Sequence, residues 1–281
     1  MKPNSTIPKI IHLTWFSGND FPKKLEQCIN TWKKLLPDYE IKLWTMEMAR
    51  SLNIQYINEA LDAQKWAFAS DVVRAYAVWK YGGVYMDTDI YLLRRFDELM
   101  TQKMVFFMEV NTAEWKAFPK ECFLKDGKCN DSQCFVLGRQ IQAAMFMAQP
   151  NQQCLEDIVE FYRHRNFLDP KGNSMINIIS PSIYAKVLEN YGFVYIDKEQ
   201  HLKDNITIFP STYVAYSPYE TFSNTISIHF ANHSWNPRSL WGKFKYYVRM
   251  TRLGAFLNKL RYYRSNSKQI GLLNANSQKA S

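Results

Sequence analysis

The chain has 281 residues, 47% of them hydrophobic and 15% aromatic, so it can bury a full core, and this composition excludes a disordered or low-complexity protein. Its net charge of +9 lies at one end: ten basic and no acidic residues follow Glu220, which leaves −1 for residues 1–220. No apolar run has the length of a membrane span or a signal peptide, so we expect a cytoplasmic protein.

The first elements predict a parallel sheet. Residues 7–16 (IPKIIHLTWF) indicate a buried strand, residues 22–36 a helix stopped by Pro37, and residues 39–44 an alternating strand. A strand, helix and strand of this length form a βαβ unit, and ligands of such sheets bind beyond the carboxyl ends of the strands. The segment from Thr14 onward is therefore expected at the ligand-binding edge.

A longer stretch, residues 65–92, organises the rest of the chain. Apolar residues recur every three or four positions from Phe68 to Trp79, which predicts a helix with one buried stripe. Gly82 should end this helix in a left-handed conformation, and Gly83 permits a tight reversal. A short apolar strand, 84–86, then leads into an Asp-Thr-Asp sequence.

Asp87 and Asp89 follow that strand at alternate positions, so both carboxylates can point the same way. Two such anions repel each other unless a cation compensates them. Carboxylate oxygens suit Mg²⁺ or Mn²⁺, which commonly complete their coordination with substrate phosphates. The alternative is an exposed acidic turn, because a motif of three residues is often fortuitous.

Asp71 and Arg74 lie one turn apart on the predicted helix. One interpretation is an exposed ion pair of little energetic value. The other is that the pair borders the two aspartates and binds a sugar and its phosphate, since arginine is suited to oxyanions.

The remaining elements are less regular. We predict a surface loop at 111–131, strands at 104–108, 133–137, 193–196, 206–209 and 225–229, and helices at 139–148, at 152–165 and from about Ser182. Cys122, Cys129 and Cys134 fall in or just after this loop. They lack a CxxC pair and a fourth ligand, which argues against zinc, and the odd total of five cysteines indicates reduced thiols.

Residues 229–235 (HFANHSW) allow two interpretations. They can form an ordinary loop with one packed tryptophan. Alternatively, His229 binds a metal while Ser234 and Trp235 donate hydrogen bonds to phosphates.

The C-terminal region is basic and aromatic. Residues 238–265 predict an amphipathic helical extension that lies on an anionic membrane surface, although a helix packed on the domain remains the alternative. The apolar face and the lack of a recognition motif argue against nucleic acid as a partner. Residues 266–281 are expected to be disordered.

Three blocks, IPKIIHLTWFSG, SDVVRAYAVWKYGGVYMDTDI and SIHFANHSW, resemble the sugar transferases of glycosyltransferase family 32. That family includes bacterial capsular polysaccharide enzymes and is distantly similar to the glucosyltransferase domain of large clostridial toxins. The resemblance implies an α/β fold of the GT-A type, Rossmann-like and nucleotide-sugar-binding, over residues 1–237. It also implies a nucleotide-sugar donor, Mn²⁺ or Mg²⁺, and retention of anomeric configuration.

The resemblance also implies roles for single residues on the nucleotide side. Trp15 would stack on the base, and the backbone near Thr14 would contact the nucleotide. Asp71 and Arg74 would hold the donor sugar and its phosphate.

On the metal side, the resemblance implies that Asp89 binds the ion directly and Asp87 binds the ribose and a metal-bound water. His229 would be the third metal ligand, with Ser234 and Trp235 on the diphosphate.

The function expected from the sequence is transfer of a hexose or N-acetylhexosamine, with UDP favoured over GDP-mannose as donor type. The expected acceptor is a hydroxyl of a lipid-linked saccharide or oligosaccharide in surface polysaccharide synthesis, at the inner face of the plasma membrane. Two alternatives stay open: a metal-dependent phosphotransferase and a non-catalytic, membrane-bound carbohydrate-binding protein.

Overall fold

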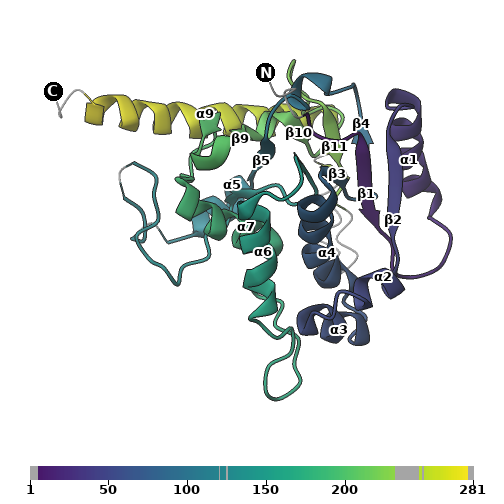
Figure 1. The fold of residues 1–281 in the computed structure, drawn as a ribbon. Helices are drawn as coiled ribbons and strands as arrows, with labels where there is room; N and C mark the ends of the chain where they lie inside the picture. The colour runs from purple at the N-terminus through teal and green to yellow at the C-terminus, as the bar shows by residue number, and fades with distance from the viewer. Residues whose placement is uncertain (1–5, 120, 125, 232–246, 249, 278–281) are drawn as a thin grey trace, which may run out of the picture.

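The computed structural model describes residues 6–119, 121–124, 126–231, 247–248 and 250–277, excepting the side chains of 265–277. Its main sheet has the strand order β2-β1-β3-β7-β5-β9-β8, with β6 paired to β5. Figure 1 shows β2, β1 and β3 next to one another at one end of this sheet. The strands are β1 (Ile10–Thr14), β2 (Glu40–Trp44), β3 (Gly83–Met86), β5 (Met104–Val110), β6 (Arg139–Ile141), β7 (Met145–Ala148), β8 (Gln200–His201) and β9 (Ile206–Phe209). The β1–β2, β1–β3 and β5–β9 pairs are parallel, as the βαβ opening predicts, but β7 runs antiparallel between β3 and β5.

Helices cover both faces of this sheet. They are α1 (Lys23–Leu35), α2 (Met46–Arg50), α3 (Gln55–Asp62), α4 (Trp66–Tyr81), α5 (Thr112–Ala117), α6 (Gln153–Arg163), α7 (Ser180–Leu188) and α9 (Arg252–Ser277). Strand β3 shows the layering: Tyr85 enters a core shared with α3, α4, α6 and α7, whereas Val84 and Met86 enter a second core shared with α1. Burial on both faces explains why the central strands are apolar throughout. The predicted α/β class is confirmed.

A second, three-stranded sheet packs against the second core. Its order is β10-β11-β4, from β10 (Val214–Ala215), β11 (Ser227–His229) and β4 (Ile90–Leu92). Strand β4 continues directly from the Asp-Thr-Asp turn and also packs against α1, whose Trp32 indole N–H donates to the Ile90 carbonyl at 2.7 Å. The two sheets are thus joined at the acidic turn.

Helix α4 ends at Gly82, as predicted. Gly82 has φ +64° and Gly83 φ +101°, and a Cβ on Gly83 would lie 2.5 Å from the Ile10 carbonyl oxygen of β1. The single apolar stripe, however, is an incomplete prediction. Nearly the whole circumference of α4 is buried, including the charged residues Asp71 and Arg74.

Several predicted elements are wrong. Residues 139–148 form β6 and β7 rather than a helix, because the alanines and methionines of this segment are buried in the middle of the sheet, where packing overrides helix propensity. Residues 133–137 and 193–196 form no strand, and 111–131 contains α5. No element is predicted for residues 46–62, which form α2 and α3.

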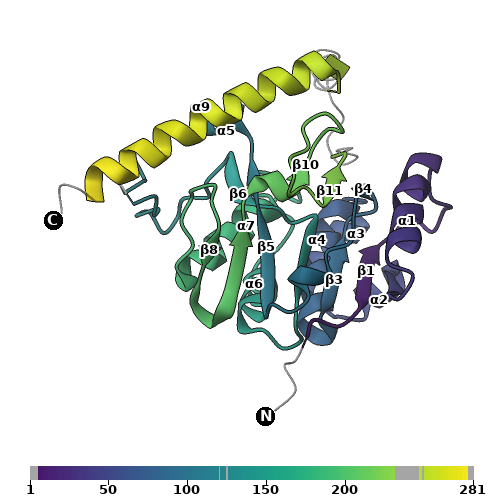
Figure 2. The same ribbon diagram turned by 90° about the horizontal axis from the view of Figure 1, so that it is seen from above.

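Helix α9 crosses over α5 and extends along one side of the molecule (Figure 2). It reaches Ser277, through positions 266–277 that the sequence predicts to be disordered. Ala255 is buried, and Asn258 donates to the Glu220 carboxylate at 2.7 Å, whereas Leu253 and Phe256 are 68% and 58% exposed. One side of the helix therefore packs on the domain and another carries exposed apolar side chains.

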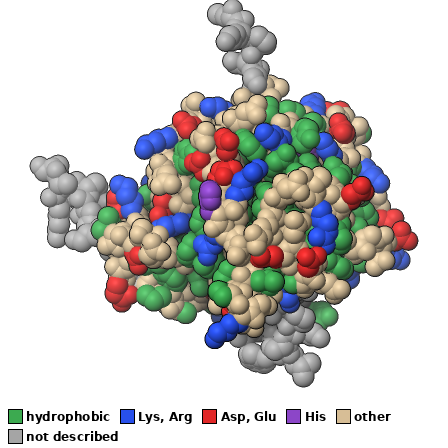
Figure 3. All heavy atoms as spheres, turned by 60° about the horizontal axis from the view of Figure 1, so that its bottom comes forward, with side chains coloured by type: hydrophobic (Ala, Val, Ile, Leu, Met, Phe, Trp, Pro, Cys, Tyr) green, Lys and Arg blue, Asp and Glu red, His purple; other side chains and the backbone are tan. Residues whose placement is uncertain are grey.

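The face of the molecule drawn in Figure 3 has mixed charge, with acidic and basic side chains interspersed rather than gathered by sign. This agrees with the net charge of −1 over residues 1–220. Among the helices that the structure describes, none has the length and hydropathy of a membrane span.

Candidate active site

The two aspartates lie on a tight turn directly after β3. The turn is closed by a hydrogen bond of 3.0 Å from the Ile90 N–H to the Asp87 carbonyl, and the Asp87 N–H donates to the Ala144 carbonyl at 2.8 Å. The carboxylates lie close together, as the sequence predicts, but on a turn rather than at alternate positions of one strand. The backbone bond to Ala144 fixes this turn to the centre of the main sheet.

His229 reaches the same place through the second sheet. Strands β11 and β4 pair antiparallel with His229 opposite Ile90, and the Phe230 N–H donates to the Asp89 carbonyl at 3.2 Å. Nε2 of His229 lies 3.3 Å from Oδ1 of Asp89. One ligand atom from each of Asp87, Asp89 and His229 falls within 4.8 Å of the others.

These three side chains fit a divalent cation. Two carboxylates and one imidazole form a donor set of hard oxygens and one nitrogen, which Mg²⁺ and Mn²⁺ accept. Nδ1 of His229 is buried and has no hydrogen-bond partner among the described residues. Burial lowers the pKa of His229, but the attraction of Asp89 and Asp87 outweighs it and raises that pKa. A bound cation would supply the positive charge that the imidazolium otherwise provides.

Arg74 anchors the acidic side of the site from α4. It is 6% exposed, and its Nη2 lies 3.1 Å from Asp71 and 3.4 Å from Asp87. Its Nη1–H donates to the Ala143 carbonyl at 2.9 Å. Burial disfavours the guanidinium charge, but Asp87, Tyr85 and Asp71 more than offset this and raise the pKa of Arg74. Arg74 is therefore charged and holds Asp87 in place.

Asp71 is buried beside Arg74, so the alternative of an exposed ion pair is wrong. The Ser180 hydroxyl of α7 donates to Oδ1 of Asp71 at 2.8 Å, and the Tyr184 hydroxyl donates to the Asp71 carbonyl at 2.9 Å. Burial raises the pKa of Asp71 to about 6, against the opposing effects of Arg74 and Ser180.

A cluster of hydroxyls connects β1 to the acidic turn. The Tyr85 hydroxyl donates to Oδ1 of Asp87 at 2.7 Å, and Thr14 Oγ1 lies 2.7 Å from Ser70 Oγ and 3.2 Å from the Tyr85 oxygen. Burial also raises the pKa of Asp87, because Arg74 and Tyr85 only partly compensate the lost solvation. The side chain of Thr14 thus supports the site, in addition to the backbone role expected for this position.

Sequence reasoning missed Ser70, Tyr85, Ser180 and Tyr184. Ser70 and Tyr85 stand within the quoted middle block, next to Asp71 and two positions before Asp87, so polar residues beside predicted site residues were a usable signal. Ser180 and Tyr184 lie more than 100 positions after Asp71, which they contact, and carry no local signal.

The other predicted residues lie apart from this network or outside the described residues. Trp15 follows Thr14, but its ring packs on Phe21 with centroids 4.8 Å apart, and its indole N–H donates to the Asn19 carbonyl at 2.6 Å. Ser234 and Trp235 lie outside the described residues.

A cavity of about 620 Å³ lies between α9 and the body, near the candidate metal ligands. Tyr216 lines it and also packs against His229, with ring centroids 5.6 Å apart. Its hydroxyl accepts a hydrogen bond of 2.9 Å from the Gln142 side chain. Phe222 and Leu257 contribute apolar side chains to the lining, which also includes the charged residues Glu220, Lys259 and Arg261.

Comparison with known proteins supports the class of site. The family described as "glycosyltransferase sugar-binding region containing DXD motif" matches residues 22–106, a segment that holds Asp71, Arg74, Asp87 and Asp89. Over this segment, the resemblance to DXD-containing glycosyltransferases is confirmed.

Individual proteins and one solved structure are also similar to this chain. Inositol phosphoceramide mannosyltransferase 3 of Schizosaccharomyces pombe is 36% identical over 101 residues, which cover 34% of this chain and 28% of that protein. Mannosyl phosphorylinositol ceramide synthase SUR1 of Saccharomyces cerevisiae is 26% identical over 215 residues, 70% of this chain and 53% of that protein. These matches span from about a quarter to about half of the relatives' lengths. Among solved structures, PaToxG glycosyltransferase aligns with a TM-score of 0.44 and 16% identity, over 66% of this chain and 70% of that one.

Proposed function

We propose that this protein is a metal-dependent glycosyltransferase of the GT-A type that uses a nucleotide-sugar donor. The main evidence for the proposal is that Asp87 and Asp89, from the DXD segment, lie beside His229 from a distant strand. An accidental acidic turn would not require a partly buried histidine placed by strand pairing beside it.

The chain's own residues divide the work at the donor. Bound Mg²⁺ or Mn²⁺ would offset the charge that grows on the leaving diphosphate. Asp87, Asp89 and His229 would hold that ion. Arg74 positions Asp87 through its 3.4 Å contact, and Asp71 with Ser180 positions Arg74. Thr14 and Trp15 lie at the edge where the nucleotide would bind, and Ser234 and Trp235 remain candidates for contacts to the diphosphate.

The donor sugar we propose is a hexose. The sequence favours UDP, whereas the relatives' names speak of mannosyl transfer and favour mannose as the sugar. Incubation with a panel of UDP- and GDP-linked hexoses and N-acetylhexosamines, with Mn²⁺ or Mg²⁺, would identify the pair by release of free sugar and nucleoside diphosphate.

The acceptor we propose is a hydroxyl of a lipid-linked or phospholipid-borne sugar alcohol or saccharide. One relative is named as an inositol phosphoceramide mannosyltransferase and another as a mannosyl phosphorylinositol ceramide synthase, so both names contain a ceramide lipid. The cavity beneath α9 combines apolar side chains with the charged residues Glu220, Lys259 and Arg261. Tyr216 connects this cavity to His229. Replacing Leu257 by Gln should raise KM for a lipid acceptor without changing hydrolysis of the donor alone, and an equal loss in both would contradict this location.

Association with an anionic membrane surface at the cytoplasmic face is a further part of the proposal. Leu253 and Phe256 are exposed on α9, next to Arg252 and other cations and without an acidic residue on the helix. Replacing both by Gln should weaken binding to vesicles rich in anionic lipid. Leu43→Gln, at a 40% exposed position on β2, is the matched control and should bind as the unaltered chain does.

The stereochemical outcome we propose is retention, by front-side attack of the acceptor hydroxyl with the departing phosphate as base. Asp87 and Asp89 would bind the metal and Asp71 pairs with Arg74, so none of these three acidic residues is left to act as a nucleophile. NMR of the product anomer tests this step, and an inverted anomer would exclude it.

The rival functions give different results in one set of assays. A phosphotransferase would move phosphate from a nucleoside triphosphate and ignore nucleotide sugars. A non-catalytic carbohydrate-binding protein would bind the nucleotide sugar with Mn²⁺ in a calorimeter but release no sugar. Metal-dependent release of sugar from one donor of the panel supports the glycosyltransferase, and either rival pattern would overturn it.

A further inference from the structure

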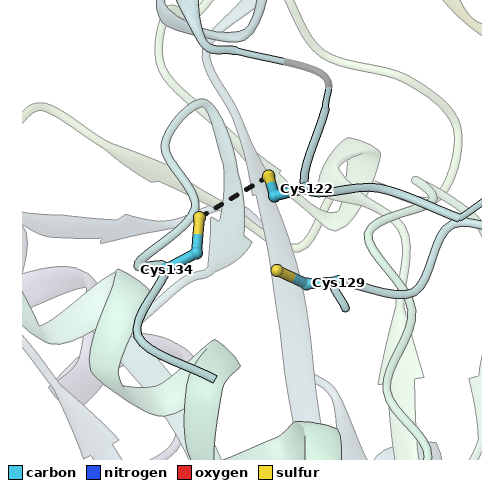
Figure 4. Close-up of side chains that lie close together, drawn as sticks. All are labelled: Cys122, Cys129 and Cys134. Atoms are coloured by element: carbon cyan, nitrogen blue, oxygen red, sulfur yellow. Dashed lines mark hydrogen bonds between the residues drawn. The ribbon is translucent and has the colours of Figure 1, made fainter. Parts of the chain in front are cut away.

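Three of the five cysteines converge on one point away from the candidate active site. The Sγ atoms of Cys122, Cys129 and Cys134 all lie within 4.8 Å of one another (Figure 4). Those of Cys122 and Cys134 are 3.6 Å apart. That separation is far above the S–S bond of about 2.0 Å and close to the roughly 3.8 Å between two thiolates that bind one zinc ion tetrahedrally at about 2.3 Å.

The backbone places these sulfurs by two local structures. Cys122 and Cys129 lie on the two sides of a small hairpin, in which the Asn130 N–H donates to the Cys122 carbonyl at 2.8 Å and Phe123 bridges to Cys129. A turn then returns the chain: the Cys134 N–H donates to the Asp131 carbonyl at 3.2 Å. The spacing that argues against a zinc site in the sequence is therefore bridged by hairpin and turn.

The segment has little core of its own. Phe123 packs on Trp115 and Tyr195, with centroids 5.1 and 5.6 Å away, and with Cys129 and Cys134 it lies at the edge of the first core. Backbone bonds such as that from the Tyr195 N–H to the Gly127 carbonyl, 2.9 Å, also hold the hairpin. Small units of this kind are commonly stabilised by a metal or a disulfide. The three cysteines are partly exposed rather than fully buried, so an ion can reach them.

We propose that Cys122, Cys129 and Cys134 form a binding site for a thiophilic divalent cation of the zinc type. Thiolate ligands select such ions over Mg²⁺ and Mn²⁺, so the site would differ in specificity from the carboxylate site. Among the described residues, no histidine, acidic residue or further cysteine joins this group, so water or a small anion would complete a tetrahedron. Its role would be to fix residues 122–134 on the domain.

Cobalt gives the direct test, because Co²⁺ bound by thiolates shows a charge-transfer absorption that carboxylate ligands do not produce. The reduced chain carrying Asp89→Asn, which disables the other site, should give this band with one equivalent of Co²⁺ and lose it when Zn²⁺ is added. Cys122→Ser, Cys129→Ser and Cys134→Ser should each lower Zn²⁺ affinity by about 100-fold or more, measured against a chromophoric chelator. Cys28→Ala, which removes a buried thiol on α1, is the control and should leave affinity unchanged.

A second measurement needs no variant. Zn²⁺ should protect these three cysteines, and no others, from alkylation of the reduced, folded chain, as read by peptide mass mapping. Absence of a thiolate band, alkylation unaffected by Zn²⁺, or loss of affinity in Cys28→Ala equal to that in the loop variants would each overturn the proposal. A Cys122–Cys134 disulfide that forms readily in a chain with no affinity for Zn²⁺ would do the same.

Discussion

The two groups of potential metal ligands differ in how the fold holds them. Each brings three ligand atoms within 4.8 Å of one another. Asp87, Asp89 and His229 come from two sheets and are fixed by strand pairing and by buried Arg74, whereas the three cysteines come from one hairpin and the turn after it. The first group is preorganised by the whole domain, while the second depends on local structure. Loss of an ion should therefore stop chemistry at the first and loosen a segment at the second.

The largest effect is expected at the carboxylate site. Asp89→Ala should reduce metal-dependent release of sugar from the donor by about 1,000-fold, because it removes a charged group at the centre of transition-state stabilisation. The melting temperature and the cobalt–thiolate band of the cysteine site should stay as in the unaltered chain. A variant that keeps its activity would show that the candidate active site is misplaced.

The stability difference between the unaltered chain and Asp71→Asn, a variant of the same site, should depend on pH. The pKa of Asp71 is raised by burial to about 6, so the folded state binds this proton more tightly than the unfolded state. The unaltered chain should therefore lose stability relative to Asp71→Asn as the pH rises from about 4 to about 6, by about 3 kcal/mol in total, with no further relative change above that range. Denaturant unfolding of both chains at several pH values measures it.

The competing result is a difference between the two chains that does not change with pH. It would mean that Asp71 keeps its charge through this range and that Arg74 fully compensates its burial. Cys134→Ser should show no such divergence from the unaltered chain over the same pH range, which would assign the effect to the preorganised site.

The sequence could predict the parts of the candidate active site that lie close together along the chain. The double glycine, the strand and the two aspartates are local features, and their order alone indicates a rigid acidic turn. For His229 the residues alone leave a loop position and a metal ligand as alternatives, and only the family resemblance favours the ligand, since the pairing of β11 with β4 that places it has no local signal. The helix predicted at residues 139–148 is wrong for the same reason: helix propensity is a local property, whereas the burial of this segment between β3 and β5 is not.

In the cysteine loop, the spacing along the chain and the positions in the fold lead to opposite expectations about a metal site. Its spacing lacks a standard zinc motif, yet the hairpin and the turn bring the sulfurs together. A sequence motif specifies only how far apart residues lie along the chain. Turns of the backbone can bring residues with other spacings together in space.

Arg74→Lys should have a smaller effect than loss of a metal ligand. Lysine keeps the charge but cannot reach Asp71, Asp87 and the Ala143 carbonyl together, so Asp87 would be held less firmly. We expect kcat for sugar release to fall about 30-fold, roughly the 2 kcal/mol of one charged hydrogen bond. Arg50→Lys, at an exposed ion pair with Asp62, is the matched control and should keep full activity. Equal activities in both variants would show that Arg74 does not position the site.

The smallest predicted effect tests whether the hairpin is independent of the candidate active site. Gly127 has φ +85°, and a Cβ there would lie 2.7 Å from Ile196 Cγ1, so Gly127→Ala should disturb the docking of the hairpin and lower Zn²⁺ affinity by about tenfold, about 1.4 kcal/mol. Gly172→Ala has a similar φ of +81° but no atom within 4 Å, so it carries the backbone strain without the contact and lies outside the loop. It should leave Zn²⁺ affinity unchanged, and both variants should keep sugar release. If Gly127→Ala lowered sugar release as well, the two groups of ligands would be coupled, and the separation between a preorganised and a local site would fail.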